Sequence, residues 1–209
     1  EPQDCERYQR RHGGCLVHVL PENNKGLAYV RQYIYIHAKK SWYWLLDDDI
    51  SQLYATQNKR NIKTSFRNAL EASQASIVRH ASIAHASLEY QQFAWAARQP
   101  YILNGYCDVC VAIHPGKIGS LVQYRQNLTL KVDRDFTLQV LAHGLHTMRV
   151  TSYSFAAPKN GTNKGGLDRM YATQGFEAHE CQDMAKLWPG ICAPIVKKDG
   201  RHDLKIKWD

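Results

Sequence analysis

The chain has 209 residues, about the length of one ordinary domain and enough to bury a sizeable core. Its hydrophobic content of 44% and charged content of 22% are typical of soluble globular proteins and exclude a disordered chain. No apolar segment is long enough to span a bilayer and no signal peptide opens the chain, so we expect no membrane partner. The first residues, Glu1-Pro2-Gln3-Asp4, lack a Met, which suggests an excised domain or a chain missing its beginning.

The charge balance bears on the class of partner. The formal net charge is +8, and the pI is about 9.2. A basic surface favours a polyanion such as nucleic acid or a nucleotide, although a merely soluble basic surface explains the charge equally well. Much of the excess lies late in the chain, at Lys159, Lys164, Arg169, Lys197, Lys198, Arg201, Lys205 and Lys207.

The cysteines indicate the redox compartment. Six are scattered along the chain, and only Cys107 and Cys110 have the spacing of a zinc site. The segment Tyr106–Ile113 is predicted to be a strand, which would point these two thiols to opposite faces, and there is no second Cys-x-x-Cys pair. We therefore expect reduced cysteines in an intracellular protein, cytoplasmic or nuclear, and no zinc site.

In chain order, the first elements predict a β-α-β unit. Cys15–Leu20 is a short apolar segment that predicts a strand, and Asn23 or Asn24 is a plausible N-cap for the helix that follows Gly26. Apolar residues recur along that helix at helical spacing up to the Lys39-Lys40-Ser41 break. Parallel strands would place the Gly26 turn and the end of the next strand at one edge of the sheet, where backbone N–H groups suit a diphosphate.

The next strand leads into three consecutive aspartates. Trp42–Ile50 is an aromatic, apolar run interrupted by Asp47-Asp48-Asp49, which predicts a buried strand with carboxylates at its end. Strand alternation would point Asp47 and Asp49 the same way, and two oxygen ligands on one side suit Mg²⁺ or Mn²⁺. An acidic cap facing water is the alternative. Arg31, one turn into the preceding helix, could reach the same site.

The rest of the chain continues an α/β pattern without repeats or linkers. Asp133-Arg134-Asp135 opens a helix that ends at Gly144, and either capping or a functional carboxylate at a pocket edge explains these two acids. The remaining predictions are a polar, turn-rich segment at Ser51–Lys63, a helix at Thr64–Ala81, a strand pair or bent strand over Tyr101–Leu103 and Tyr106–Ile113, a strand at His146–Phe155, a helix at Glu177–Trp188 and an edge strand at Ile195–Trp208.

Together these segments resemble a GT-A glycosyltransferase. In that family a Gly-x-Ala-x-x-Arg helix precedes a strand that ends in an Asp-x-Asp metal motif, and this chain has Gly26-Leu27-Ala28-Tyr29-Val30-Arg31 followed by Asp47-Asp48-Asp49. Many members then have Glu-Asp-x-Asp at the start of a later helix. Here Val132 replaces the Glu before Asp133-Arg134-Asp135.

The chain is more closely similar to the TET-associated glycosyltransferase family, whose members include phage and bacterial enzymes that glycosylate 5-hydroxymethylpyrimidines in DNA. The residues that carry this resemblance span nearly the whole chain: Glu1-Pro2-Gln3, Leu20-Pro21, Arg31, Trp44–Ile50, Asp133–Gly144, Lys164-Gly165-Gly166, Tyr171 and Gly200-Arg201. The resemblance implies an α/β fold with a GT-A-like mixed sheet flanked by helices, in a single domain over residues 1–209. The family's first strand would lie upstream of Glu1.

The resemblance also implies roles for individual residues. The Mn²⁺ or Mg²⁺ would be held by Asp47 and Asp49, with His202 a further candidate although it is displaced from the position of the family's late His. The UDP-sugar donor would be bound by Gly26, Tyr29, Arg31, Asp47, Asp48, Lys164 and Gly165. Asp133 would be the general base, and Asp135 would orient Asp133 or the acceptor.

The acceptor implied by the family is 5-hydroxymethylpyrimidine in DNA, flipped out of the duplex and flanked by the basic tail. Two alternatives remain open: a protein O-glycosyltransferase, and a catalytically inert GT-like binding domain, which the loss of the Glu at Val132 would favour. The sequence identifies neither the sugar nor the oligomeric state.

Overall fold

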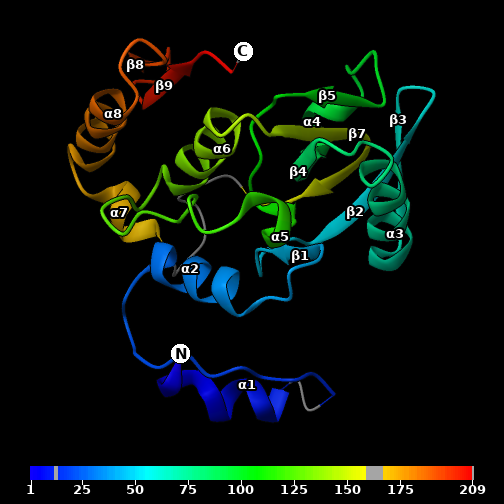
Figure 1. The fold of residues 1–209 in the computed structure, drawn as a ribbon, viewed down its shortest axis with the longest axis horizontal. Coiled ribbons are helices and arrows are strands. Elements are labelled where there is room, and N and C mark those ends of the chain that lie inside the picture. The colour runs from blue at the N-terminus through cyan, green and yellow to red at the C-terminus, as the bar shows by residue number, and fades with distance from the viewer. Residues whose placement is uncertain (12–13, 159–166, 209) are drawn as a thin grey trace.

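The fold is built on a seven-stranded sheet whose two longest strands, β4 and β7, lie at its centre (Figure 1). The structure is a computed structural model that describes residues 1–11, 14–158 and 167–208. The strand order is β1-β6-β4-β7-β2-β3, and β5 pairs with β7. Central β4 and β7 are parallel, whereas the other pairs are antiparallel, so the sheet is mixed. The strands are β1 (Tyr43–Leu46), β2 (Gln52–Gln57), β3 (Arg60–Thr64), β4 (Ile83–Tyr90), β5 (Tyr101–Leu103), β6 (Cys110–Ile113) and β7 (His146–Ala156).

Helices cover both faces of this sheet. Alternate residues of β6 enter two separate core clusters, Val111 and Ile113 on one face and Cys110 and Ala112 on the other. The first cluster includes residues of α2 (Leu27–His37), α6 (Val132–Ala142) and α8 (Phe176–Leu187), and the second includes residues of α3 (Phe66–Ile77). The predicted α/β fold, a mixed sheet flanked by helices in one domain, is confirmed.

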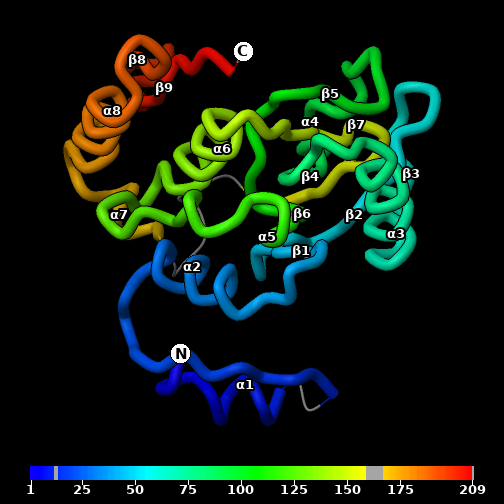
Figure 2. Tube along the Cα trace, in the orientation of Figure 1, coloured from blue at the N-terminus to red at the C-terminus, as the bar shows by residue number. Residues whose placement is uncertain are grey.

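The remaining elements are short or peripheral. Among them are η1 (Pro2–Asp4), α1 (Cys5–Arg11), α4 (Gln91–Ala94), α5 (Pro115–Ile118), α7 (Asp168–Ala172), and a separate hairpin of β8 (Cys192–Val196) and β9 (His202–Ile206). In the tube view, α1 runs beneath α2 and β1, and the β8–β9 hairpin lies beyond α6 at the other end (Figure 2). None of the helices within the described residues is long and apolar enough to cross a bilayer.

The predicted β-α-β unit at the start of the chain is wrong. Cys15–Leu20 forms no strand, because only Leu20 is buried in it and Leu16 is 83% exposed. The helix that follows is α2, as predicted, but its N-cap is Gly26 and not Asn23 or Asn24. Strand β1 lies at the edge of the sheet, antiparallel to β6, and no other described strand pairs with it.

Three further predictions need correction. Ser51–Lys63 contains the β2–β3 hairpin, whose turn residues Asn58 and Lys59 both have positive φ, as a two-residue hairpin turn requires. Tyr101–Leu103 pairs with β7, and not with the strand that follows it. The C-terminal segment forms the β8–β9 hairpin outside the main sheet, where a single edge strand was expected.

Cys107 and Cys110 lie on opposite sides of the sheet, as predicted, but the strand predicted over Tyr106–Ile113 is shorter and begins at Cys110. Cys107 precedes β6 and lies in the first core cluster, whereas Cys110 lies in the second. All six thiols are free, and burial raises the pKa of Cys107 to about 12. Neither buried thiol is therefore a ready metal ligand.

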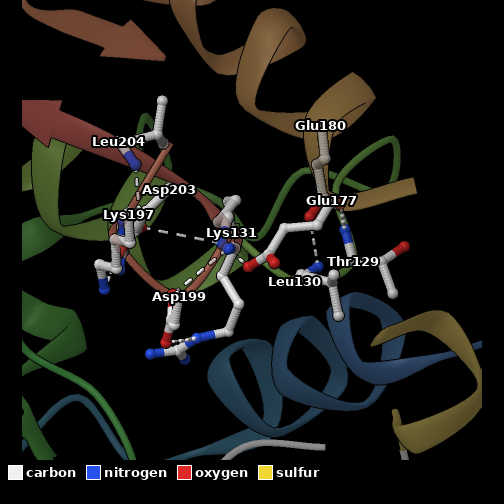
Figure 3. A network of polar contacts seen from close by, with 11 residues as sticks. Thr129, Leu130, Lys131, Glu177, Glu180, Lys197, Asp199, Asp203 and Leu204 are labelled. Atoms are coloured by element: carbon white, nitrogen blue, oxygen red, sulfur yellow. Dashed lines mark hydrogen bonds and ion pairs between the residues drawn. The ribbon is translucent and has the colours of Figure 1, made fainter. Parts of the chain in front are cut away.

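An ion-pair network fastens the C-terminal hairpin and α8 to the start of α6 (Figure 3). Lys131 Nζ lies 2.6 Å from Glu177 Oε1 and 4.0 Å from Asp203 Oδ1. Asp203 also pairs with Lys197 and with Arg134. The buried carboxylate of Glu180 accepts the backbone N–H groups of Leu130, at 2.6 Å, and of Thr129. These contacts fix the residues that lead into α6.

We expect Asp203→Asn to destabilise the fold by about 3–5 kcal/mol, because it removes the carboxylate that pairs with the mostly buried Arg134, whereas Lys131 keeps Glu177. Burial alone would raise the pKa of Asp203, but hydrogen bonds from Lys197 and Arg134 outweigh it and hold the pKa well below its ordinary value. The contribution of Asp203 is therefore complete above its unfolded pKa of about 3.9 and is lost as the pH falls below it.

Denaturant unfolding from pH 7 to pH 2 measures both effects. The variant should be less stable at pH 7 and should lose less stability on acidification than the parent. Asp199→Asn is the matched control, because Asp199 pairs with the half-exposed Arg201 and its removal should cost less than about 1 kcal/mol. Equal destabilisation by the two variants would contradict the assignment.

Candidate functional site

The site is organised around Arg31, which lies on the inner face of α2. The buried residues of this helix are Ala28, Arg31 and Tyr35, at helical spacing, so the guanidinium is carried into the protein with a side chain only 4% exposed. Its Nη2 donates to Asp47 Oδ1 at 3.0 Å, and its Nη1 forms a close ion pair with Asp133 Oδ1. Arg31 therefore joins the two acidic segments that the sequence singled out.

The three aspartates follow the end of β1. That strand ends at Leu46, and Asp48 and Asp49 lie in a turn, so strand alternation does not extend to them as predicted. Asp48 is exposed, whereas Asp47 and Asp49 are half-buried. Burial raises the pKa of the Asp47 carboxyl, the charge of Arg31 opposes this shift, and repulsion from Asp49 and Asp48 adds to it.

Asp133 and Asp135 point to different sides of α6. Asp133 contacts Arg31, whereas the Asp135 side chain is fully buried and accepts hydrogen bonds from Arg125 at 2.7 Å, Gln139 at 2.7 Å and Trp188 at 2.8 Å. Burial raises the pKa of Asp135, and its donors, Trp188 foremost, oppose that shift. The structure gives Asp135 an internal set of partners and does not bring it to Asp133.

A strained turn beside the aspartates escaped sequence reasoning. Val109 has φ of 59°, which is costly for a β-branched residue, and its carbonyl accepts the N–H of Asp47 at 2.9 Å. The preceding Asp108 is buried and accepts a hydrogen bond from Tyr90 at 2.6 Å. Burial raises the pKa of Asp108, while hydrogen bonds from Tyr90 and Tyr106 oppose the shift. No sequence pattern marks this turn, because valine is not a turn residue.

The other predicted site residues are dispersed. Gly26 is the exposed N-cap of α2, with φ of 84°, and Tyr29 is half-buried in its first turn. Lys164 and Gly165 lie outside the described residues. His202 is exposed at the start of β9, and Figure 1 places β9 at the end of the molecule away from β1. In the part of the chain that the structure describes, no three His, Cys, Asp or Glu side chains form a metal-binding group, so Asp47, Asp49 and His202 are not assembled.

Comparisons with known proteins fit this arrangement. The family model described as TET-Associated Glycosyltransferase matches residues 1–166, which include the aspartate turn, Arg31 and the whole of α6. No curated protein and no solved structure matches the chain. Since the match covers well over half of the sequence and includes both acidic segments, the chain belongs to the TET-associated glycosyltransferase family.

Proposed function

We propose that this protein is a metal-dependent, inverting glycosyltransferase that moves a sugar from a UDP-sugar to a hydroxyl acceptor. The observation that carries the proposal is the double ion pair of Arg31 with Asp47 and Asp133. Through it, the acidic turn proposed to hold a metal and donor lies beside the carboxylate proposed to act as base. Membership of a glycosyltransferase family supports sugar transfer as the chemistry.

The acidic turn fits a divalent cation whose coordination is completed by its substrate. Mg²⁺ in phosphate-transfer sites is typically held by one or two carboxylates, and diphosphate oxygens and water fill the other positions. As the family's Asp-x-Asp motif implies, we assign Asp49 as the principal metal ligand, with Asp48 and Asp47 in support. When bound, Mg²⁺ or Mn²⁺ would neutralise the negative charge that develops on the UDP leaving group.

Asp133 is the proposed general base. Its ion pair with Arg31 uses Oδ1 and fixes the direction of the carboxylate, so Oδ2 would accept the proton. The acceptor hydroxyl oxygen would form a bond to the anomeric carbon of the sugar as its proton passes to Asp133. The bond from that carbon to the phosphate oxygen would break on the opposite side, and its electron pair would leave with UDP. Asp135 would act indirectly, by holding α6 through Arg125 and Trp188.

The donor side of the site combines α2 with the loop before it. The N–H groups in the first turn of α2, opened by Gly26, suit an anion, and Tyr29 lies in the same turn. In place of the phosphate contact predicted for Arg31 from the sequence, we propose that this residue positions the two carboxylates.

Asp133→Asn should impair sugar transfer, whereas Asp49→Asn should impair metal-dependent UDP binding. Asp133→Asn keeps the side-chain shape but removes the proton acceptor, so Mn²⁺-dependent UDP binding should persist while transfer slows by about 10²–10⁴-fold. Asp49→Asn should abolish the metal dependence of UDP binding. Calorimetry and a transfer assay measure the two effects, with Glu71→Gln on the exposed face of α3 as a charge-matched control. Near-normal transfer by Asp133→Asn would assign the base elsewhere.

The proposed acceptor is a 5-hydroxymethylpyrimidine in DNA. The net charge of +8 supports a polyanionic acceptor, and the exposed Lys198, Lys205 and Lys207 lie on or beside the β8–β9 hairpin. A base within a duplex would have to be flipped out to reach Asp133, and flanking phosphates would then contact such lysines. Lys197 is not counted with them, because it pairs with Asp203.

Replacing Lys198, Lys205 and Lys207 together with Ala should weaken DNA binding and flatten its salt dependence, by about 0.9 in log–log slope for each duplex phosphate that a lysine no longer neutralises. Mn²⁺-dependent UDP binding should not change. The matched control replaces Lys59, Lys63 and Arg67, three exposed cations of β3, its turn and α3, with Ala. Sugar transfer to peptide hydroxyls and none to hydroxymethylated DNA would favour a protein O-glycosyltransferase. The absence of both transfer and UDP-sugar hydrolysis would favour an inert binding domain.

A further inference from the structure

Helix α1 and the aspartate turn line a common cavity. The cavity has a volume of about 400 Å³ and is lined by Arg7, Tyr8, Arg11 and Asp48. This volume lies within the range of small-molecule sites, which is roughly 300–1,000 Å³. The cavity therefore adjoins the proposed metal site on the side of α1, a helix to which the sequence analysis gave no role.

The short helix η1, which leads directly into α1, is hydrogen-bonded to the loop before α2. The backbone N–H of Gln3 donates to Asn23 Oδ1 at 3.1 Å, and the Gln3 side-chain amide donates to Asn24 Oδ1 at 3.3 Å. That loop continues directly into Gly26, the N-cap of α2. Through Gln3, the chain holds α1 beside the loop that precedes the proposed donor-binding turn.

The face of α1 toward the cavity carries like charges. Arg7 and Arg11 are four residues apart and lie on the same side of the helix, with Tyr8 beside them. Neither arginine forms an ion pair with another described residue, whereas Arg10, which does not line the cavity, pairs with Glu6 at 3.7 Å. Two like charges at this spacing destabilise a helix unless an anion compensates them. The cavity thus has two cations available to a ligand.

A nucleotide bound at the proposed metal site would need cations to offset its negative charge. A nucleoside diphosphate brings several negative charges into a site that already holds Asp47, Asp48 and Asp49. Arg31 cannot offset them, because Asp47 and Asp133 already engage both of its terminal nitrogens. Arginine suits phosphate oxygens, because its planar guanidinium can donate two parallel hydrogen bonds. A cavity with two arginines and one exposed aspartate matches a ligand that carries both a phosphate and a divalent cation.

We propose that Arg7 and Arg11 of α1 bind the diphosphate of the metal–nucleotide donor, with Asp48 on the metal side of the same ligand. This inference rests on the proposed function and adds a diphosphate-binding element to it. Because α1 has no buried residue, ligand binding should also hold this helix against the body of the protein.

The test compares Arg7→Gln, Arg11→Gln and Arg10→Gln, three single charge removals on one helix. Calorimetry with UDP and Mn²⁺, and separately with pyrophosphate and Mn²⁺, should show about 10- to 100-fold weaker binding for the first two variants and less than about twofold change for the third. Arg7→Lys and Arg11→Lys should bind more tightly than the Gln variants but less tightly than the parent, since an ammonium group keeps the charge but cannot donate two parallel hydrogen bonds. Thermal unfolding should change little in all three Gln variants, because none of the residues is buried and i,i+4 charge pairs on a helix contribute little to stability.

The outcomes separate this inference from the proposed function. If the parent protein binds UDP with Mn²⁺ and the three Gln variants bind it equally well, the inference fails and the proposed function stands. If the parent binds pyrophosphate through Arg7 and Arg11 but no UDP, the anion site stands and the UDP-dependent function fails. A parent that binds neither ligand would overturn both. Weaker duplex-DNA binding with unchanged UDP binding in Arg7→Gln and Arg11→Gln would assign α1 to nucleic acid and overturn the inference.

Discussion

The ion pairs of Arg31 are the interaction on which the site depends. One nearly buried guanidinium holds Asp47, at the end of an edge strand, and Asp133, at the start of α6, although the two carboxylates come from segments far apart in the chain. Without the charge of Arg31, the partly buried carboxylates of Asp47 and Asp133 would lie unpaired close to the two other aspartates of the turn after β1. Repulsion among these carboxylates would then oppose folding of the site. The pairing therefore makes a dense group of acids compatible with a folded protein.

The start of α6 is fixed from several directions at once. Val132 enters the core, Asp133 meets Arg31, Arg134 pairs with Asp203, and Asp135 accepts hydrogen bonds from Arg125 and Trp188. Because these four consecutive side chains contact four different parts of the fold, the first turn of α6 has little freedom to rotate or shift. Such rigidity suits a carboxylate that must meet a reacting hydroxyl with defined geometry. The C-terminal hairpin contributes to it through Asp203.

Sequence reasoning succeeded where local pattern decides the structure. The amphipathic segments gave α2, α3, α6 and α8, and the acids of both site segments stood out by their positions at the ends of elements. It failed at Cys15–Leu20, where an apolar run remains unpaired and largely exposed, and at the β2–β3 hairpin, whose edge strand is too polar to show alternation. The partnership of Arg31 with Asp133 and the strained Val109 depend on tertiary contacts, which no local pattern encodes.

Double-mutant cycles on unfolding free energy test the central claim most directly. The cycles combine Arg31→Met with Asp133→Asn and, separately, with Asp47→Asn, and Arg31→Met with Asp199→Asn serves as the distant control. If Arg31 bridges the two acids, each of the first two cycles should show a coupling energy of about 1–3 kcal/mol, and the control should be additive within about 0.5 kcal/mol. Additive behaviour in both of the first two cycles would contradict the account, because the guanidinium would then hold neither carboxylate.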